Sequence, residues 1–185
     1  MAKCSICKSR KGKRKCIAKN FFICSLCCGN YRQKEVCGNC PYFREVKLKG
    51  KYNEVPMYSL QMMEDRQDLQ DYANAIESAL CAFDHSLGNQ VNDDTVLKIL
   101  ELLLDTYYFK ENNITSNDEI VDNGFAFVSA KVKEDLCEIS EEVITKIIRT
   151  IYFVAKRRTK GQREYLDFIH QYVGIRLGKG MRILS

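Results

Sequence analysis

Residues 4–40 read CSICKSRKGKRKCIAKNFFICSLCCGNYRQKEVCGNC, and eight of these residues are cysteines. Their spacing is C-x2-C-x8-C-x7-C-x2-C-C-x8-C-x2-C, which contains three CxxC pairs. A CxxC pair closes a tight turn that directs two sulfurs at one ion, so this spacing is typical of a metal site. The predicted ligands are Cys4, Cys7, Cys16, Cys24, Cys27, Cys28, Cys37 and Cys40.

The adjacent cysteines Cys27 and Cys28 indicate two metal sites, because neighbouring side chains point in different directions. In an interleaved arrangement one site uses Cys4, Cys7, Cys24 and Cys27, and the other uses Cys16, Cys28, Cys37 and Cys40. Exchanging Cys27 and Cys28 fits the spacing equally well. All-thiolate tetrahedral sites are typical of closed structural zinc, so we expect two Zn²⁺ ions. An iron–sulfur cluster is the alternative, although the usual C-x2-C-x2-C run is absent.

Four segments and one arginine carry a family resemblance: CSIC (4–7), RKGKRKC (10–16), ICSLCCG (23–29), Arg32 and CGNCPY (37–42). Together they resemble the N-terminal zinc finger of small prokaryotic proteins whose remaining chain is helical. More loosely, they are similar to cross-brace treble-clef fingers of the B-box and HIT types. They differ from those fingers in using only cysteine and in placing the single Cys16 where those have a pair. The resemblance covers about a quarter of the chain and implies metal binding but no activity, since such fingers contact proteins and RNA alike.

Charge divides the chain into three parts. Residues 1–51 hold fourteen Lys/Arg and two Glu, residues 52–154 hold seven Lys/Arg and twenty Asp/Glu, and residues 155–185 hold eight Lys/Arg and two Asp/Glu. The first part stays basic even with eight thiolates around two Zn²⁺ ions. Two basic ends therefore flank an acidic middle, which indicates a surface for a polyanion such as nucleic acid or a ribonucleoprotein. The alternative is that the ends dock on the acidic middle or are simply solvated.

The basic loop over residues 8–19 lies between two ligand clusters, so metal would hold it at both ends. Preorganised cations there can grip phosphates, with Phe21, Phe22 or Tyr31 as stacking faces. A second basic run, residues 156–160 with Arg163, lies at a predicted helix-to-helix turn, where cations also complement the helix C-terminus. The candidate nucleic-acid contacts are Arg10, Lys11, Lys13, Arg14, Lys15, Lys19, Arg32, Lys156, Arg157 and Arg158.

The domain organisation follows from composition. Residues 1–43 form the metal module, whose few apolar residues leave much of the folding energy to the metal. Residues 44–56 are expected to be a linker, in which Gly50 and Pro56 interrupt regular secondary structure. Residues 57–185 contain no proline and show a period near 3.6, which predicts an α-helical domain of about five helices and no hairpin. The predicted fold class is therefore mainly α.

Helix starts are predicted by capping residues. The first helix should run from Met57 to about Leu87. Residues 92–94 offer caps for a second helix, whose apolar residues go nearly all round and which should therefore be central and buried. Ser140 should open another helix, and two capping boxes should open two more. The boxes are Ser116 with Glu119 and Thr159 with Gln162.

The sequence shows no catalytic constellation, so we expect a protein without enzymatic activity. Residues 174–180, GIRLGKG, differ from a phosphate-binding loop in spacing and follow a predicted helix. Cys81 and Cys137 fall on helix patterns and are expected in the core, and His85 and His170 have no ligand partners in sequence. Without a membrane-length apolar run or a signal peptide, a reducing cytoplasm is the expected compartment.

The predicted function is a non-catalytic zinc-binding adaptor that contacts nucleic acid, RNA or a ribonucleoprotein in particular. One alternative is a protein–protein interaction or homo-oligomerisation module with purely structural zinc. Another is a redox or iron–sulfur sensor.

Overall fold

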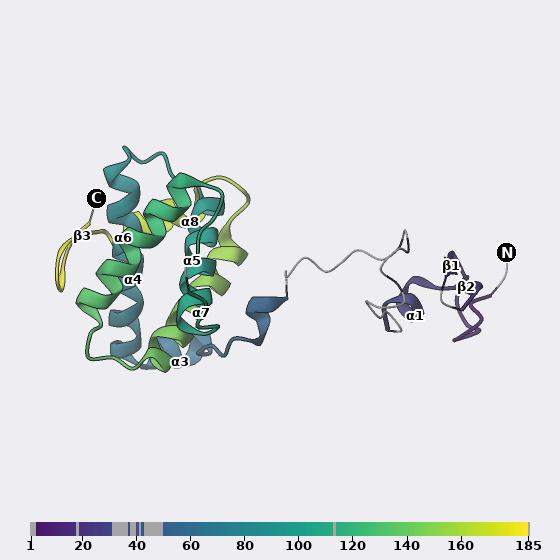
Figure 1. The fold of residues 1–185 in the computed structure, drawn as a ribbon. Coiled ribbons are helices and arrows are strands. Elements are labelled where there is room, and N and C mark those ends of the chain that lie inside the picture. The colour runs from purple at the N-terminus through teal and green to yellow at the C-terminus, as the bar shows by residue number, and fades with distance from the viewer. Residues whose placement is uncertain are drawn as a thin grey trace. The chain divides into compact units, whose positions relative to one another are not determined.

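The computed structural model describes residues 3–17, 19–30, 37, 40, 42, 50–112 and 114–184. The chain divides into two compact units, Met1–Gly50 and Lys51–Ser185. The predicted mainly α fold is confirmed, with a cysteine-rich module preceding a helical unit (Figure 1). None of the helices in the described ranges combines the length and apolarity needed to cross a bilayer.

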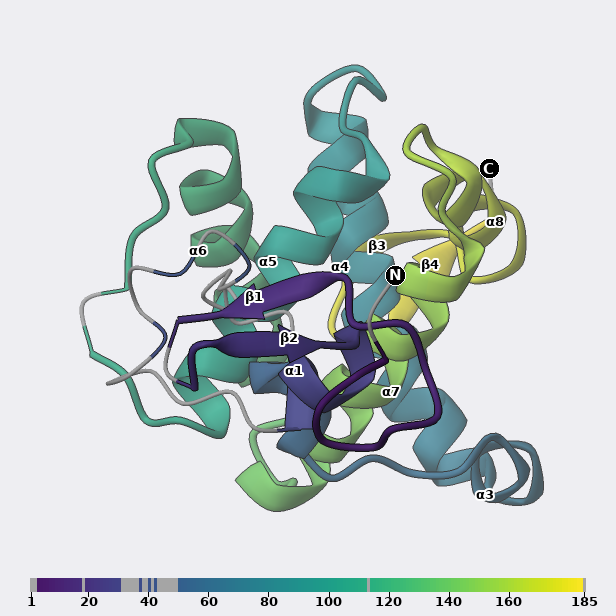
Figure 2. The same cartoon turned by 90° about the vertical axis from the view of Figure 1, so that its right-hand side faces the viewer.

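The first unit contains a short hairpin followed by a helix. Strands β1 (Arg14–Cys16) and β2 (Phe21–Ile23) pair antiparallel, and helix α1 (Ser25–Asn30) follows β2 (Figure 2). Ile23 and three cysteines make up its buried core, with Ile6 packed against them. Two three-residue strands over so small a core are marginal by themselves, so a metal crosslink would add much of the stability of this unit.

The second unit holds six α-helices among its described residues. They are α3 (Leu60–Asp65), α4 (Gln67–Ser86), α5 (Asp93–Tyr107), α6 (Glu119–Asp135), α7 (Glu141–Arg158) and α8 (Glu164–Tyr172). The predicted first helix is two helices, because Arg66 adopts an extended conformation between α3 and α4. The other four agree with the sequence expectation in number and order.

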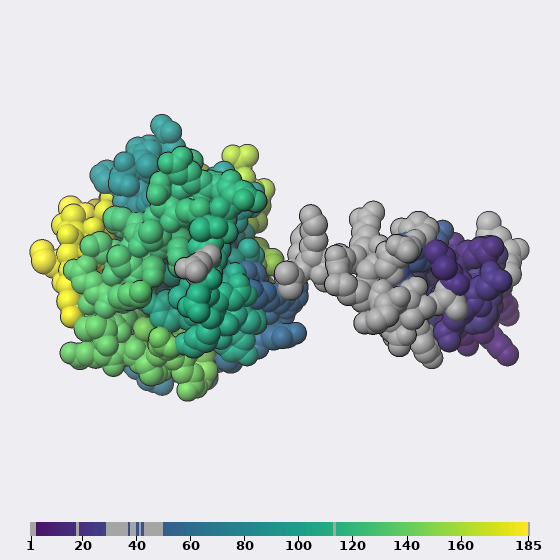
Figure 3. Space-filling view, viewed as in Figure 1, coloured from purple at the N-terminus to yellow at the C-terminus, as the bar shows by residue number. Residues whose placement is uncertain are grey.

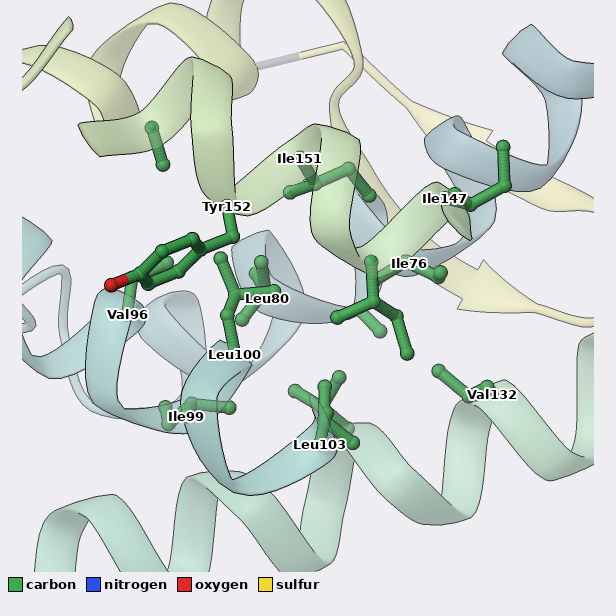
Figure 4. Close-up of a cluster of buried hydrophobic side chains, with 14 of the residues drawn as sticks. Ile76, Leu80, Val96, Ile99, Leu100, Leu103, Val132, Ile147, Ile151 and Tyr152 are labelled. Carbon is green, nitrogen blue, oxygen red and sulfur yellow. The ribbon is translucent and has the colours of Figure 1, made fainter. Parts of the chain in front are cut away.

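Helix α5 is largely buried, as the apolar residues on nearly all its sides predicted. Side chains of α4, α6 and α7 pack around it (Figure 4). Each fully buried aliphatic side chain contributes about 1.5–3 kcal/mol relative to exposure. The labelled core residues are Ile76, Leu80, Val96, Ile99, Leu100, Leu103, Val132, Ile147, Ile151 and Tyr152.

Residues 51–56, which the sequence assigned to a linker, pack on the helical unit. The 3-10 helix η1 (Lys51–Glu54) opens the unit, and Val55 is 3% exposed. The Lys51 ammonium pairs with Asp105 at 2.6 Å, and Arg149 Nε donates to the carbonyl of Tyr52 at 2.6 Å. These partners lie about fifty and a hundred residues away in the chain, so local composition gave no sign of them.

A C-terminal hairpin corrects the expectation that the helical region has none. Strands β3 (Ile175–Gly178) and β4 (Met181–Ile183) pair antiparallel, and they lie at the surface of the unit (Figure 3, yellow). The hairpin is fixed by tertiary contacts: Arg176 is almost fully buried and forms two hydrogen bonds to Asp135 of α6. Gly178 ends β3, and Lys179 and Gly180 form the turn, so this glycine-rich stretch does not open a helix.

Candidate metal centre

Four cysteine sulfurs of the first unit come together. The Sγ atoms of Cys4, Cys7, Cys24 and Cys27 all lie within 4.8 Å of one another. The Cys7 and Cys24 sulfurs are 3.9 Å apart. Sulfurs at the corners of a tetrahedron around a zinc ion, each about 2.3 Å from the metal, are about 3.8 Å apart. The four thiols can therefore hold one metal ion.

The first ligand pair sits on a tight turn anchored to the hairpin. The N–H of Lys8 donates to the carbonyl of Cys4 at 2.8 Å, and Lys8 takes a positive φ of 53° to close the turn. The N–H of Ser5 donates to the carbonyl of Phe22 in β2 at 3.0 Å. This bond places Cys4 and Cys7 beside the end of β2, where the second pair begins.

The second ligand pair joins β2 to α1. Cys24 follows β2 directly, and Cys27 lies in the first turn of α1. The N–H of Cys27 donates to the Sγ of Cys24 at 3.4 Å, and the N–H of Cys28 donates to the Cys24 carbonyl at 2.9 Å. A backbone N–H directed at a sulfur stabilises thiolate charge and fixes the orientation of a ligand.

Burial and hydrogen bonding act differently on the four thiols. Cys4, Cys24 and Cys27 are buried, and Cys7 is half-buried. Hydrogen bonding from Ser9 lowers the pKa of Cys7 to about 5, whereas burial raises the pKa of Cys27 to about 12. Metal ligation needs thiolates, so occupation of this cluster must release protons and weaken in acid.

The grouping found is the first of the two pairings that the sequence left open. The remaining predicted ligands, Cys16, Cys28, Cys37 and Cys40, are half-buried. Across the described ranges they do not form a second group of three or more potential ligands. The second zinc site stays a prediction.

The basic loop is exposed in its described part. Arg10, Lys11, Lys13, Lys15 and Lys19 have exposed side chains. Nearby, Phe21 and Phe22 are 37% and 48% exposed. The half-buried Arg14 holds its guanidinium 5.4 Å from the centre of the Tyr42 ring. Arg32 and Tyr31 lie outside the described residues.

The second basic run makes contacts within its own unit. Lys156 donates to the Tyr152 hydroxyl at 3.1 Å, and the Arg157 and Arg158 guanidinium groups lie 5.3 Å and 3.6 Å from the Phe153 and Phe168 ring centres. Each cation at the end of α7 thus lies beside a different aromatic ring, of which Phe168 belongs to α8. Cations at the end of α7 complement the negative end of the helix dipole. Their separate aromatic partners keep the three charges from gathering at one point on the surface.

Sequence reasoning missed two polar clusters of the helical unit. The buried carboxylate of Asp84 accepts hydrogen bonds from Arg163 and His170, and Glu77 accepts one from the Tyr165 hydroxyl. The partners are more than seventy residues apart, so no local motif links them.

The two cysteines outside the first unit differ in their surroundings. Cys81 is fully buried, as predicted, but Cys137 is exposed, which corrects its assignment to the core. It lies just beyond the end of α6, where the helical pattern no longer determines burial.

Comparisons with protein families, with curated proteins and with solved structures find no match. The fold and the cluster define a chain of two parts, a cysteine-rich module that can hold a metal and a helical unit.

Proposed function

We propose that the module binds structural zinc and that its basic surface contacts nucleic acid, RNA in preference to DNA. The four-cysteine cluster carries the first half of this proposal. Four protein thiols fill all four positions of a tetrahedral ion, which leaves no position for a substrate or an activated water. The order of a ligand turn, a hairpin and a helix whose first turn supplies Cys27 also supports a treble-clef type of finger.

The charge of the module supports the second half. Residues 3–30 contain eight Lys/Arg and no Asp/Glu. Four thiolates around one Zn²⁺ would add only two negative charges, so six positive charges remain in this segment. A small rigid surface of one sign attracts phosphate chains and releases their counterions.

Exposed aromatic rings beside these cations favour single-stranded RNA. Phe21 and Phe22 project from β2, next to Lys15, which is the partner of Phe22 in the hairpin. Unstacked bases in single strands can lie on such rings, whereas bases in a DNA duplex are not available for stacking.

The test is binding of the zinc-loaded full chain to a labelled single-stranded RNA, measured by fluorescence anisotropy between 50 and 200 mM salt, the range over which such complexes weaken by orders of magnitude. Each phosphate contact to a single strand contributes about 0.7 to the slope of log K against log salt. Replacing both Lys13 and Lys15 with glutamine should therefore weaken binding and lower that slope by about 1.4. The matched control replaces Lys98 and Lys133 on the helical unit, with the same change in charge. Absence of binding at 50 mM salt, or an equal loss in the control, would overturn the RNA proposal.

Exposed apolar residues of the same module support a second candidate, a protein-binding role. Ile17 and Leu26 are 58% and 57% exposed. If they form an interface between copies, nuclease-treated protein should dimerise, and Leu26→Ser should return it to a monomer in light scattering. Metal analysis separates both candidates from an iron–sulfur sensor. Iron in the purified protein, with visible absorbance at about 400 nm, would exclude structural zinc.

A further inference from the structure

A hollow of about 420 Å³ lies between α3, α4, α7 and α8. Ala73, Thr150 and Ile151 are buried and form its floor. Its volume falls in the range of small-molecule sites, which are mostly apolar with a few polar groups. The apolar walls come from Leu60, Met63, Val154 and Phe168, and the polar positions are Glu64, Gln70, Asn74 and Glu77.

The charged residues that line this hollow are both acidic, while the Arg158 guanidinium lies 3.6 Å from the ring centre of Phe168, one of its walls. Glu64 from α3 and Glu77 from α4 line it, and no Lys or Arg does. Neither carboxylate forms an ion pair with a residue in the described ranges. Glu77 accepts a hydrogen bond of 2.6 Å from the hydroxyl of Tyr165, which is a neutral donor.

Burial raises the pKa of Glu77 to about 7, against the lowering effects of the Tyr165 hydrogen bond and the more distant charge of Arg182 on β4. No lysine or arginine lines the hollow beside Glu77, and the carboxylate forms no ion pair with a residue in the described ranges. The hollow therefore offers apolar walls and one carboxylate, that of Glu77, which has no positively charged partner among the described residues.

We propose that this hollow binds an amphipathic ammonium ion, with the ammonium group on Glu77 and the apolar chain against Leu60, Val154 and Phe168. The ammonium group supplies a positive partner for the Glu77 carboxylate. The carboxylate of Glu64 on α3 also attracts a positive charge. The walls bury the chain, so a small inorganic cation would gain only part of this interaction. This site lies entirely in the helical unit and is independent of the proposed zinc and RNA roles.

The test is a titration of the isotope-labelled full chain with hexylammonium, 1-hexanol and hexanoate, followed by amide chemical shifts at pH 7.5. Hexylammonium should saturate in the millimolar range and shift amides of α3, α4 and α7 around the hollow. The alcohol should bind at least about tenfold more weakly, because it lacks the charge-assisted hydrogen bond. Hexanoate should not bind. Equal affinity for the amine and the alcohol would overturn the proposal.

Variants separate the carboxylate from the apolar wall. Glu77→Gln keeps an acceptor for Tyr165 and should weaken hexylammonium binding by at least about tenfold. The matched control is Glu101→Gln, since Glu101 accepts a comparable hydrogen bond of 2.7 Å from Tyr152 but does not line the hollow. Leu60→Ser, at a side chain that is 44% exposed, should weaken hexylammonium but leave methylammonium unchanged. Unchanged binding in Glu77→Gln, or an equal loss in Glu101→Gln, would contradict the site.

Proton release gives an independent readout. At pH 7 part of the Glu77 population is protonated, and ammonium binding requires the carboxylate. Hexylammonium affinity should therefore rise from pH 6 to pH 8 in the wild type and stay flat in Glu77→Gln. A flat profile in the wild type would overturn the role of Glu77.

Discussion

The backbone N–H of Cys27 donates a hydrogen bond to the Sγ of Cys24 across 3.4 Å. The bond links two cysteines that belong to one CxxC pair and to one cluster of four sulfurs. It directs a positive dipole at a sulfur that must carry charge once it binds a metal, so Cys24 is placed as a ligand before any metal arrives.

Replacing Cys24 with serine should remove the metal held by the four-sulfur cluster, because a hydroxyl at this position cannot supply a thiolate. The measurement is zinc per chain by elemental analysis of purified protein. Cys137→Ser is the matched control, since Cys137 is exposed and lies outside the first unit. A full complement of zinc in Cys24→Ser would show that the cluster does not bind the ion.

Chelation of the metal should unfold the first unit and leave the second folded. The first unit has a very small core, whereas the helical unit has a large one of its own. Amide spectra after chelation should lose the dispersed signals of β1, β2 and α1 and retain those of α4 to α8. Loss of both sets together would contradict the division into independent units.

The carboxylate of Asp84 is fully buried and accepts hydrogen bonds from Arg163, His170 and the N–H of Val91. Asp84→Asn should destabilise the helical unit by about 2–4 kcal/mol, because it removes the buried partner of Arg163 and leaves that charge only the exposed carboxylate of Asp167. Urea denaturation measures this loss. Asp68→Asn, which breaks an exposed ion pair with Arg66, should leave the urea midpoint unchanged.

Acid should remove the contribution of Asp84. Burial alone would raise the pKa of this carboxyl, but the hydrogen bonds from Arg163 and His170 hold it below its usual value. The stabilisation is therefore complete above the unfolded pKa of about 3.9 and is lost as the pH falls through the folded pKa. The stability difference between wild type and Asp84→Asn should shrink below about pH 4.

Glu77 should give the opposite pH dependence. Its folded pKa of about 7 lies above the unfolded value of 4.5, so the folded state binds the proton more tightly. The contribution of Glu77 to stability is then complete below about pH 4.5 and falls by roughly 1–3 kcal/mol as the pH rises through 7. Relative to wild type, Glu77→Gln should gain stability between pH 5 and pH 8 in urea denaturation. A constant difference would mean that Glu77 is ionised in the folded protein throughout.

Helix starts show what local sequence can predict. Asn92 and Ser140 accept from the backbone N–H groups of Thr95 and Val143, as their capping residues predicted. The box at Ser116 was placed two residues early, since Asp118 caps α6 and Ser116 instead bonds to Asp118. A short side chain reaches only two or three residues, so such predictions succeed where the cap is local.

The start of α8 required tertiary information. The predicted box at Thr159 does not cap it, because the buried Asp93 of α5 accepts from the N–H groups of Tyr165 and Leu166. The same limit applies to the candidate site. Spacing predicted which CxxC pairs come together, but the choice of Cys27 over Cys28 for this cluster depends on how α1 follows β2.

The C-terminal hairpin rests on Gly174, which precedes β3. Gly174 has a φ of +84°, and a Cβ there would lie 2.3 Å from the carbonyl oxygen of Ile183 in β4. Gly174→Ala should therefore separate the strands and destabilise the unit by more than the conformational cost of about 1 kcal/mol for a positive φ. Gly161→Ala isolates that cost, since Gly161 has a φ of +99° and a Cβ there would meet no atom within 4 Å. Equal urea midpoints for the two variants would show that the approach of Gly174 to Ile183 does not hold the hairpin in place.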